Sequence, residues 1–293
     1  MMGRLNHSPQ FASRQNAPGT RSLRGENSRA QLIAVAAAET PEAMRRALGR
    51  IAAAQPDMIE WRVDALAGVT AHDDLTALST AFAILCEGWD GRILATYRTE
   101  VEGGGGVASQ HSSVVRALLA ESSRVAGAGR SGIDAIDIEA SSTDAAALCQ
   151  EVIGHGLIPV ISTHDFTARH VSADDVEAAL TRLATIAGTS GDSTPLDDAR
   201  VIPVVKIAWT PTTVDDTMTM IAAARAFAER HRGRLDVIAI AMGEHGVLNR
   251  IVPSLSGSMA TFVSVDGAAS APGQVDCQAL RAFDEATGCL SFR

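Results

Sequence analysis

The amino-acid sequence predicts an α/β protein whose main body is a closed (β/α)8 barrel. From Gln31 onward, short apolar runs alternate with amphipathic segments, and eight such alternations favour a closed barrel over an open doubly wound sheet. No G-x-G-x-x-G motif follows the first apolar run, which argues against a dinucleotide-binding fold. The 293 residues suffice for one large barrel, and a hydrophobic share of 46% can fill its core. These observations indicate a single domain of the TIM-barrel type.

Each predicted strand is a short apolar run, and each predicted helix is the amphipathic segment that follows it. The strands lie at 31–37, 57–62, 92–98, 133–139, 157–163, 201–208, 235–242 and 259–265. The helices lie near 41–54, 72–87, 109–126, 143–154, 172–188, 213–231, 246–252 and 276–286. Ser172 and Thr213 each precede carboxylates of a first helical turn, which predicts helix N-caps at both residues. Pro203 cannot donate to a strand ladder, so we expect it to mark the start of its strand.

Two segments are predicted to lie outside the packed core. Residues 1–29 are rich in Arg, Ser, Asn, Gln and Gly, and Glu26 is their only acidic residue. Such a segment cannot bury enough apolar surface to offset its chain entropy, so we expect a disordered tail at 1–29 and the barrel domain at 30–293. The tail lacks the apolar stretch of a secretory signal, and its apolar residues show no helical spacing that would support a transit peptide. The polar segment Thr189–Arg200 is expected to be an exposed loop.

Charge and composition exclude several classes of protein. The formal charge of −9 argues against a nucleic-acid binder, which normally has a basic face. No apolar run approaches the roughly 20 residues that are needed to cross a bilayer. The four cysteines show no C-x-x-C pair, so they indicate reduced thiols and not a disulfide framework or a zinc site. We expect a cytoplasmic protein that holds no metal.

Lys206 is the most informative residue because it lies in the apolar run 201–208. A strand that is apolar on both faces is normally buried in a parallel sheet, where lysine is rare without a partner. Burial disfavours the ammonium form, so we expect this amine to lose its proton more readily than a reference lysine with a pKa of about 10. A neutral amine can form a Schiff base with a ketone. The alternative is a lysine that reaches solvent or pairs with an acidic neighbour.

Polar side chains near the ends of the neighbouring strands share one parity. Strand residues alternate between two faces, so residues two apart point to the same side. The pairs are Glu60 and Arg62, Thr96 and Arg98, Asp137 and Glu139, and Ser162 and His164. With Lys206, they place ionisable groups at the C-terminal ends of five consecutive strands, where barrel enzymes have their active sites. A purely structural account would require several separate buried ion pairs, each with a desolvation cost.

Several short motifs follow one another along the chain. They are Glu60-Trp61-Arg62-Val63-Asp64, Thr96-Tyr97-Arg98 with Glu102-Gly103-Gly104, Asp137-Ile138-Glu139, Ser162-Thr163-His164-Asp165-Phe166, Val205-Lys206-Ile207-Ala208, Met242-Gly243, Arg250, and Ser270-Ala271-Pro272-Gly273-Gln274. Each motif alone is weak, but their order and spacing resemble the type I 3-dehydroquinate dehydratase family. The resemblance covers about residues 31–290.

The resemblance implies a role for individual residues. Lys206 matches the Schiff-base lysine, His164 the general acid and base, and Glu102 the carboxylate that orients this histidine. The substrate-binding positions are Glu60, Arg62 and Arg98 for hydroxyl groups and site order, Arg250 for the carboxylate, Ser270 and Gln274 for a closing lid, and Met242 and Phe262 for apolar walls. The chain departs from the family pattern at Asn249, where serine is common, in the longer loop 189–200, and in the alanines that end the first strand.

The implied reaction is the loss of water from 3-dehydroquinate to give 3-dehydroshikimate in the shikimate pathway of aromatic amino acid biosynthesis. The resemblance further implies a homodimer and a small-molecule substrate, with no cofactor. Two alternatives remain: another Schiff-base barrel enzyme, such as a class I aldolase, and a non-catalytic sensor of pathway intermediates. An aldolase for phosphorylated sugars would need a phosphate site after strands seven and eight, where this chain has Ser-Ala-Pro-Gly-Gln. A sensor would not need the lysine, histidine and glutamate together.

Overall fold

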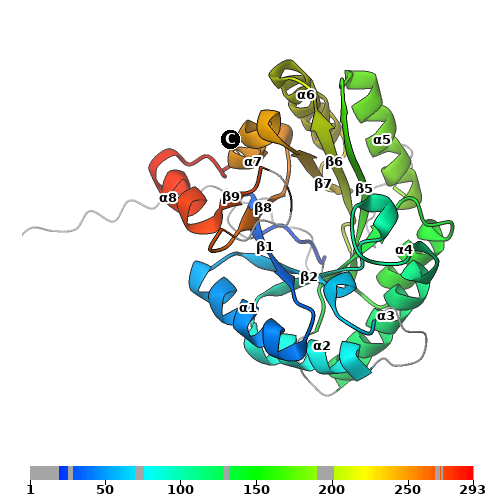
Figure 1. Ribbon diagram of the computed structural model, residues 1–293. Coiled ribbons are helices and arrows are strands. Elements are labelled where there is room, and N and C mark those ends of the chain that lie inside the picture. Colours follow the sequence, from blue (N-terminus) through cyan, green and yellow to red (C-terminus); the bar gives the residue numbers. More distant parts are fainter. Residues whose placement is uncertain are drawn as a thin grey trace, which may run out of the picture.

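A computed structural model of the chain describes residues 20–25, 29–69, 76–127, 132–189, 201–267, 271 and 273–292. Within these residues, parallel strands follow one another around a ring and the helices lie outside them (Figure 1). The predicted α/β barrel is confirmed. Residues 1–19 and 26–28 of the predicted tail, and residues 190–200 of the predicted loop, lie outside the described residues.

The strands and helices alternate as the sequence predicts. The strands are β1 (Gln31–Ala37), β2 (Met58–Arg62), β3 (Arg92–Thr96), β4 (Ala135–Glu139), β5 (Ile158–Arg169), β6 (Val204–Pro211), β7 (Asp236–Ala241), β8 (Ala260–Ser264) and β9 (Val275–Asp276), hydrogen-bonded in the order β7-β6-β5-β4-β3-β2-β1-β8-β9. The helices are α1 (Pro41–Ala54), α2 (Thr76–Gly88), α3 (His111–Gly127), α4 (Ala145–Gly154), α5 (Ala173–Ile186), α6 (Val214–Arg230), α7 (Val247–Ile251) and α8 (Cys277–Thr287). The prediction lacks β9, because two residues carry no periodic pattern.

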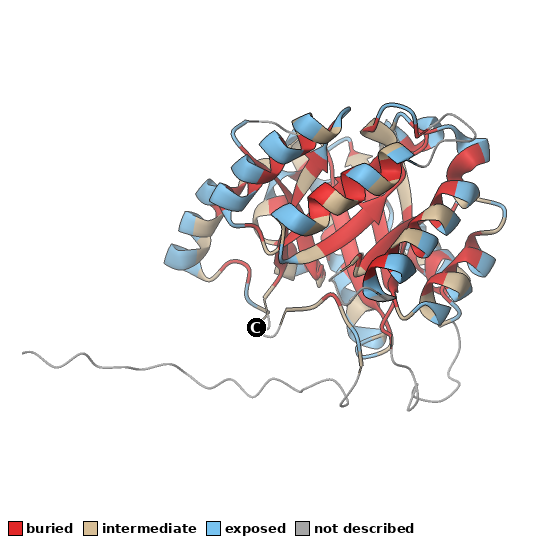
Figure 2. Ribbon diagram, turned by 90° about the horizontal axis from the view of Figure 1, so that it is seen from below, coloured by how far each residue is buried: buried red, intermediate tan, exposed pale blue. Residues whose placement is uncertain are grey.

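The alternation of side chains along the strands separates two apolar cores. On β2, Met58 packs inside the barrel, whereas Ile59 and Trp61 pack outward. The Trp61 ring stacks on Phe82 of α2 with ring centroids 5.8 Å apart. Figure 2 shows the consequence: the strands of the ring are buried for most of their length, while the surrounding helices bury one face and expose the other. The predicted alternation of strand side chains between the inner and the outer face of the barrel is therefore confirmed.

The predicted helix starts are confirmed at α5 and α6. Ser172 and Asp175 form a capping box at the start of α5, and Thr213 and Asp216 form another at the start of α6. In each box the hydroxyl accepts a backbone N–H, and the carboxylate accepts the N–H of the capping residue, so two otherwise unpaired donors are satisfied. Pro203 directly precedes β6, as its missing N–H predicts.

Strands β5 and β6 both end later in the chain than the sequence predicts. Their pairing continues past the barrel rim, with Ala168 opposite Thr210 and Arg169 opposite Pro211 after a register shift. The Arg169 guanidinium lies over the Trp209 ring at 4.6 Å from its centroid. This extension is polar and partly exposed, so it lacks the apolar run that identifies a buried strand.

Residues 20–25, which the sequence assigns to the tail, lie against the N-terminal end of the barrel. Leu23 is 1% exposed and joins the interior core. Ser22 donates to Asp236 at 3.0 Å, and Arg24 pairs with the same carboxylate. Arg21 lies 3.5 Å from Asp134. We call this segment and its partners the barrel floor. No helix in the described ranges is long and apolar enough to span a membrane.

The barrel floor generates a stability prediction. Leu23→Ala should lower the free energy of unfolding by about 2–5 kcal/mol, because it removes a buried leucine from a packed core. Urea denaturation measures this change. Leu255→Ala is the matched control, since that leucine is 37% exposed and its loss should cost far less. Equal stability of the two variants would show that residues 20–25 belong to the tail.

Candidate active site

One pocket opens at the C-terminal ends of the strands. Its lining includes all ten described residues that the sequence proposes for the site, namely Glu60, Arg62, Arg98, Glu102, His164, Lys206, Met242, Arg250, Phe262 and Gln274. Ser270, the remaining candidate, lies outside the described residues. The pocket is also lined by Gly103, Phe166, Ala208, Ile240 and Ala271. Residues spread over more than 200 positions of the sequence thus meet around a single space.

Lys206 is the third residue of β6, with its side chain inside the barrel and 4% of the residue exposed. Its Nζ atom is 3.5 Å from Asp137 Oδ2 and 3.8 Å from Glu60 Oε1. The Phe262 ring lies beside the amine, with its centroid 4.5 Å from Nζ. A further feature of Lys206 is that it is the only lysine in the chain. The amine therefore lies between two carboxylates and an aromatic face.

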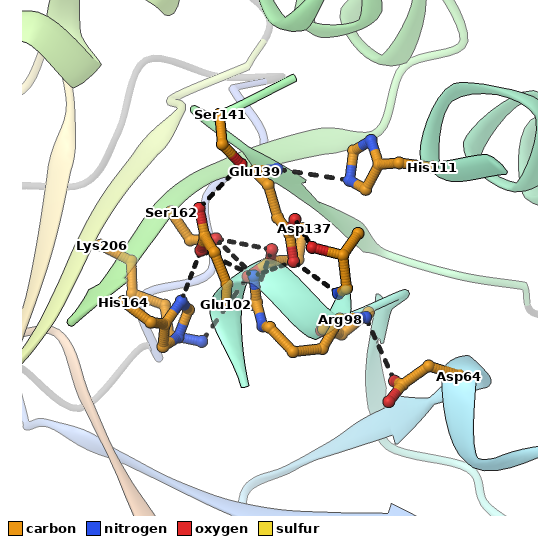
Figure 3. A network of polar contacts seen from close by, with 12 residues as sticks. Asp64, Arg98, Glu102, His111, Asp137, Glu139, Ser141, Ser162, His164 and Lys206 are labelled. Carbon is orange, nitrogen blue, oxygen red and sulfur yellow. Dashed lines mark hydrogen bonds and ion pairs between the residues drawn. The ribbon is translucent and has the colours of Figure 1, made fainter. Parts of the chain in front are cut away.

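Arg98 connects the carboxylates of the site (Figure 3). Its guanidinium lies 2.8 Å from Glu139, 2.8 Å from Asp137 and 3.3 Å from Glu102. It also donates to Ser162 Oγ at 3.1 Å. Burial alone would lower the pKa of Arg98, but the three carboxylates around it raise the pKa above its usual value. The group is a permanent cation that balances a buried negative cluster.

His164 and Glu102 form a hydrogen-bonded pair beside this cluster. His164 Nδ1 lies 2.9 Å from Glu102 Oε2, and Ser141 Oγ donates to Glu102 Oε1 at 3.0 Å. Burial, followed by the charges of Arg98 and Lys206, lowers the pKa of His164 well below its usual value. Burial, together with the nearby Glu139 and Asp137, raises the pKa of Glu102 to about 7, although Arg98 opposes this rise. The imidazole is therefore neutral and can accept a proton.

Asp64 joins the end of β2 to the glycine-rich loop after β3. Its carboxylate accepts two hydrogen bonds from Arg62, at 2.8 and 2.7 Å. It also accepts the backbone N–H groups of Arg98 and Gly105, both at 3.1 Å. A Cβ atom at Gly104 would lie 2.1 Å from the Arg98 carbonyl oxygen, so only glycine fits this turn. The pairing orients the Arg62 guanidinium at the pocket rim.

The opposite side of the pocket combines apolar side chains with one buried cation. Ile240 and Met242 follow each other at a spacing of two along β7 and the residue after it, and both line the pocket. Arg250 of α7 is 1% exposed, and its Nε donates to the Ala241 carbonyl oxygen at 3.2 Å. Burial lowers the pKa of Arg250 to about 10, so the guanidinium remains charged at neutral pH.

Sequence reasoning missed several residues that shape the site. Asp64 and Phe166 stand inside the motifs that carry the family resemblance, so their positions were visible but their contacts were not. Ile240 shares the parity of Met242, which is a signal that the strand pattern contains. Ser141 and His111 have no such signal, because a loop and a helix bring them to Glu102 and to the backbone of Glu139. Among the described residues, no three His, Cys, Asp or Glu side chains are arranged to hold a metal ion.

Comparison with known proteins identifies the family of this chain. A model of the type I 3-dehydroquinase family matches residues 33–287. The 3-dehydroquinate dehydratase of Klebsiella pneumoniae is 32% identical over 229 residues, which cover 77% of this chain and 80% of that protein. This chain belongs to the type I 3-dehydroquinase family. A second family relative, the 3-dehydroquinate dehydratase of Lactiplantibacillus plantarum, is 30% identical over 236 residues, covering 79% of this chain and 82% of that protein. The solved 3-dehydroquinate dehydratase of Geobacillus kaustophilus has a TM-score of 0.71 at 25% identity and covers 88% of this chain and 92% of its own.

The buried carboxyl of Glu102 generates a pH prediction for this family member. In the folded protein its pKa is about 7, against a reference value of 4.5. The folded state therefore binds more protons than the unfolded chain between these values, so the contribution of Glu102 to stability falls as the pH rises through this window. Because one pKa unit corresponds to about 1.4 kcal/mol, the loss amounts to roughly 3 kcal/mol.

Glu102→Gln should remove this pH dependence. Urea denaturation of both proteins at about pH 4 and about pH 8 gives the difference in unfolding free energy, which should move in favour of the variant at the higher pH. Glu244→Gln is the control, because the side chain of Glu244 is 89% exposed. A difference between the wild type and Glu102→Gln that stays constant with pH would mean that the carboxyl titrates normally.

Proposed function

We propose that this protein removes water from 3-dehydroquinate to give 3-dehydroshikimate through a Schiff base on Lys206. The observation that carries the proposal is the position of the Lys206 amine between two carboxylates, in the same pocket as a neutral His164. Membership of the type I 3-dehydroquinase family and the names of the relatives support the choice of substrate. The site offers an amine for a ketone, a base for a proton and a cation for a carboxylate.

The first step joins the substrate to the enzyme. The Lys206 amine adds to the ketone carbon, one proton is taken up from solvent, the carbonyl oxygen leaves as water with that proton and one amine hydrogen, and a protonated iminium remains. Its positive charge forms next to Asp137 and Glu60, whose carboxylates lie within 4 Å of Nζ. These fixed negative charges are buried, and they stabilise the cation electrostatically. The iminium then withdraws electrons from the neighbouring carbon.

The second step is the elimination. His164 takes a proton from the carbon next to the iminium, and the electron pair moves to nitrogen to give an enamine. The histidinium then delivers this proton to the departing hydroxyl, which leaves as water while the electrons of the enamine return. Glu102 accepts the Nδ1 proton of the ring at 2.9 Å, which directs the other nitrogen to the substrate. Hydrolysis of the iminium releases the enone and restores Lys206.

The remaining pocket residues are proposed to bind the substrate. Arg250 suits the carboxylate because its planar guanidinium can donate two parallel hydrogen bonds. Glu60 and Arg62 offer partners for ring hydroxyls, while Met242 and Phe262 contact the apolar edge of the ring. Gln274 lines the same pocket, and a lid role for it and for Ser270 stays a prediction. These roles are the ones that the family resemblance implies, and the position of each described residue in the pocket supports them.

The wider setting is also a proposal. We place the reaction in the shikimate pathway, and the enzyme in the cytoplasm as a homodimer. All four cysteines are free thiols, which supports a reducing compartment. A turnover assay that follows the ultraviolet absorbance of the enone product tests the activity. An aldolase or a sensor would give no such absorbance with 3-dehydroquinate.

The covalent step can be tested at Lys206. Borohydride added with 3-dehydroquinate should inactivate the protein, because reduction converts the iminium into a stable secondary amine. Since Lys206 is the only lysine in the chain, peptide mass spectrometry should find one adduct, on the peptide that holds it. Lys206→Arg is the control, because arginine is a basic side chain of similar length that lacks the nucleophilic amine. An adduct confined to the α-amino group of the chain would rule out the Schiff base.

The proton transfer can be tested at His164. His164→Ala should still form the adduct that borohydride traps, but its turnover should fall by about 10²–10⁴-fold, as is typical for loss of a general base. Single-turnover mass spectrometry and the absorbance assay measure the two steps separately. His164→Asn is the second variant, because it keeps a polar side chain without a titratable ring. Near-normal turnover in both variants would assign the base to another group.

A further inference from the structure

The barrel closes between β7 and β8 with few backbone hydrogen bonds. β7 pairs with β6 along all six of its residues, but toward β8 it forms a single bridge, between Val237 and Ser258. Near this bridge, the N–H of Met259 donates to the Val237 carbonyl oxygen at 2.8 Å. Above it, toward the pocket, the N–H groups and carbonyls of β7 need other partners, because buried backbone groups are costly when unpaired.

Side chains supply these partners one after another along β7. Ser258 Oγ accepts the N–H of Ala239 at 2.8 Å. Asn249 Oδ1 accepts the N–H of Ala241 at 2.9 Å. The final contact is the Arg250 guanidinium, whose Nε donates to the Ala241 carbonyl oxygen at 3.2 Å. A ladder of side chains thus continues the backbone ladder up to the pocket, and its last member is the cation that lines the pocket.

The Asn249 side chain forms hydrogen bonds through both its oxygen and its nitrogen. The residue is 1% exposed, and its Nδ2 donates to Ser256 Oγ at 3.2 Å. Ser256 Oγ also contacts Ser258 Oγ at 2.8 Å. The backbone N–H of Ala241 can only donate, so it fixes which end of the amide faces β7. The amide therefore connects β7 to the segment before β8, at the residue that immediately precedes Arg250.

We infer that Asn249 is a positioning residue for Arg250, and that the Asn249–Ser256–Ser258 chain sets where this guanidinium stands over the pocket. Asn249 and Arg250 are neighbours on α7, which has five residues, and both bond the backbone of β7 at Ala241. If the amide loses its bond to Ala241, α7 is free to shift against β7, and the guanidinium shifts with it. The inference rests on the proposed function, because Arg250 is proposed to bind the substrate carboxylate.

A double-mutant cycle separates positioning from general stability. Asn249→Ala should raise KM for 3-dehydroquinate about 10- to 100-fold, as expected for a misplaced binding group, with a much smaller change in kcat. The same change made in Arg250→Ala should add little to KM, because the group that Asn249 positions is already absent. Asn249→Ser should recover part of the affinity, since a hydroxyl can still accept a hydrogen bond.

Two further variants complete the design. Ser256→Ala removes the second hydrogen-bond partner of the Asn249 amide, so it should also raise KM, but by a smaller factor. If Asn249→Ala does not fold, Ser256→Ala replaces it in the double-mutant cycle with Arg250→Ala. Leu23→Ala is the control for lost stability, because its neighbours Ser22 and Arg24 bind Asp236 at the start of β7, away from the pocket, and it should leave KM unchanged. Thermal melts identify which variants are folded.

The outcomes distinguish this inference from the proposed function. A wild-type protein that does not turn over 3-dehydroquinate overturns the proposed function. Normal wild-type turnover combined with an unchanged KM in Asn249→Ala or Ser256→Ala overturns the positioning role alone. Equal increases in KM with and without the Arg250 guanidinium would also overturn it, because they would show that Asn249 acts on the pocket independently of Arg250.

Discussion

The mouth of this barrel depends on one buried cation, the guanidinium of Arg98. Asp137, Glu139 and Glu102 are buried, so they would repel one another, and each would be costly to bury alone. Arg98 lies within ion-pair distance of all three. Its planar, fixed geometry therefore sets the spacing between the end of β3, strand β4 and the turn that carries Glu102. The orientation of His164 follows, because Glu102 holds its ring, so the geometry of the pocket and its charge balance have the same origin.

The sequence predicts the fold well because the barrel is built from local patterns. Apolar runs identify each strand of the ring, and capping residues such as Ser172 and Thr213 identify helix starts, since both effects operate within a few residues. The errors occur where neighbours in space decide the structure. The extension of β5 to Arg169 exists because β6 continues beside it, and a pattern within one segment cannot reveal its partner. Likewise, the place of Leu23 in the interior core depends on strands that follow much later in the chain.

The contacts within the candidate site were less predictable than the fold. Parity and motif order identify which side chains face the pocket, because both are properties of the sequence. They do not identify which atoms meet. The raised pKa of Glu102 and the lowered pKa of His164 arise from burial and from the surrounding charges, and neither is encoded by the residues next to them. Asn249 illustrates the difference: as a departure from the family pattern it carries no assigned contact, whereas the structure shows its amide bonded to β7 and to Ser256.

Arg24 of the barrel floor, and Ala30 after it, contact Phe292 and Leu290 from the other end of the barrel domain. Arg24 lies over the Phe292 ring at 4.8 Å from its centroid, and the N–H of Ala30 donates to the Leu290 carbonyl oxygen at 2.8 Å. The same early segment contacts Asp236 at the start of β7. A chain that emerges from the ribosome N-terminus first makes these contacts only after residues 290–292 have been released. These contacts therefore form only after the strands of the ring have been synthesised, and a chain cut before residue 290 leaves Arg24 and Ala30 without these partners.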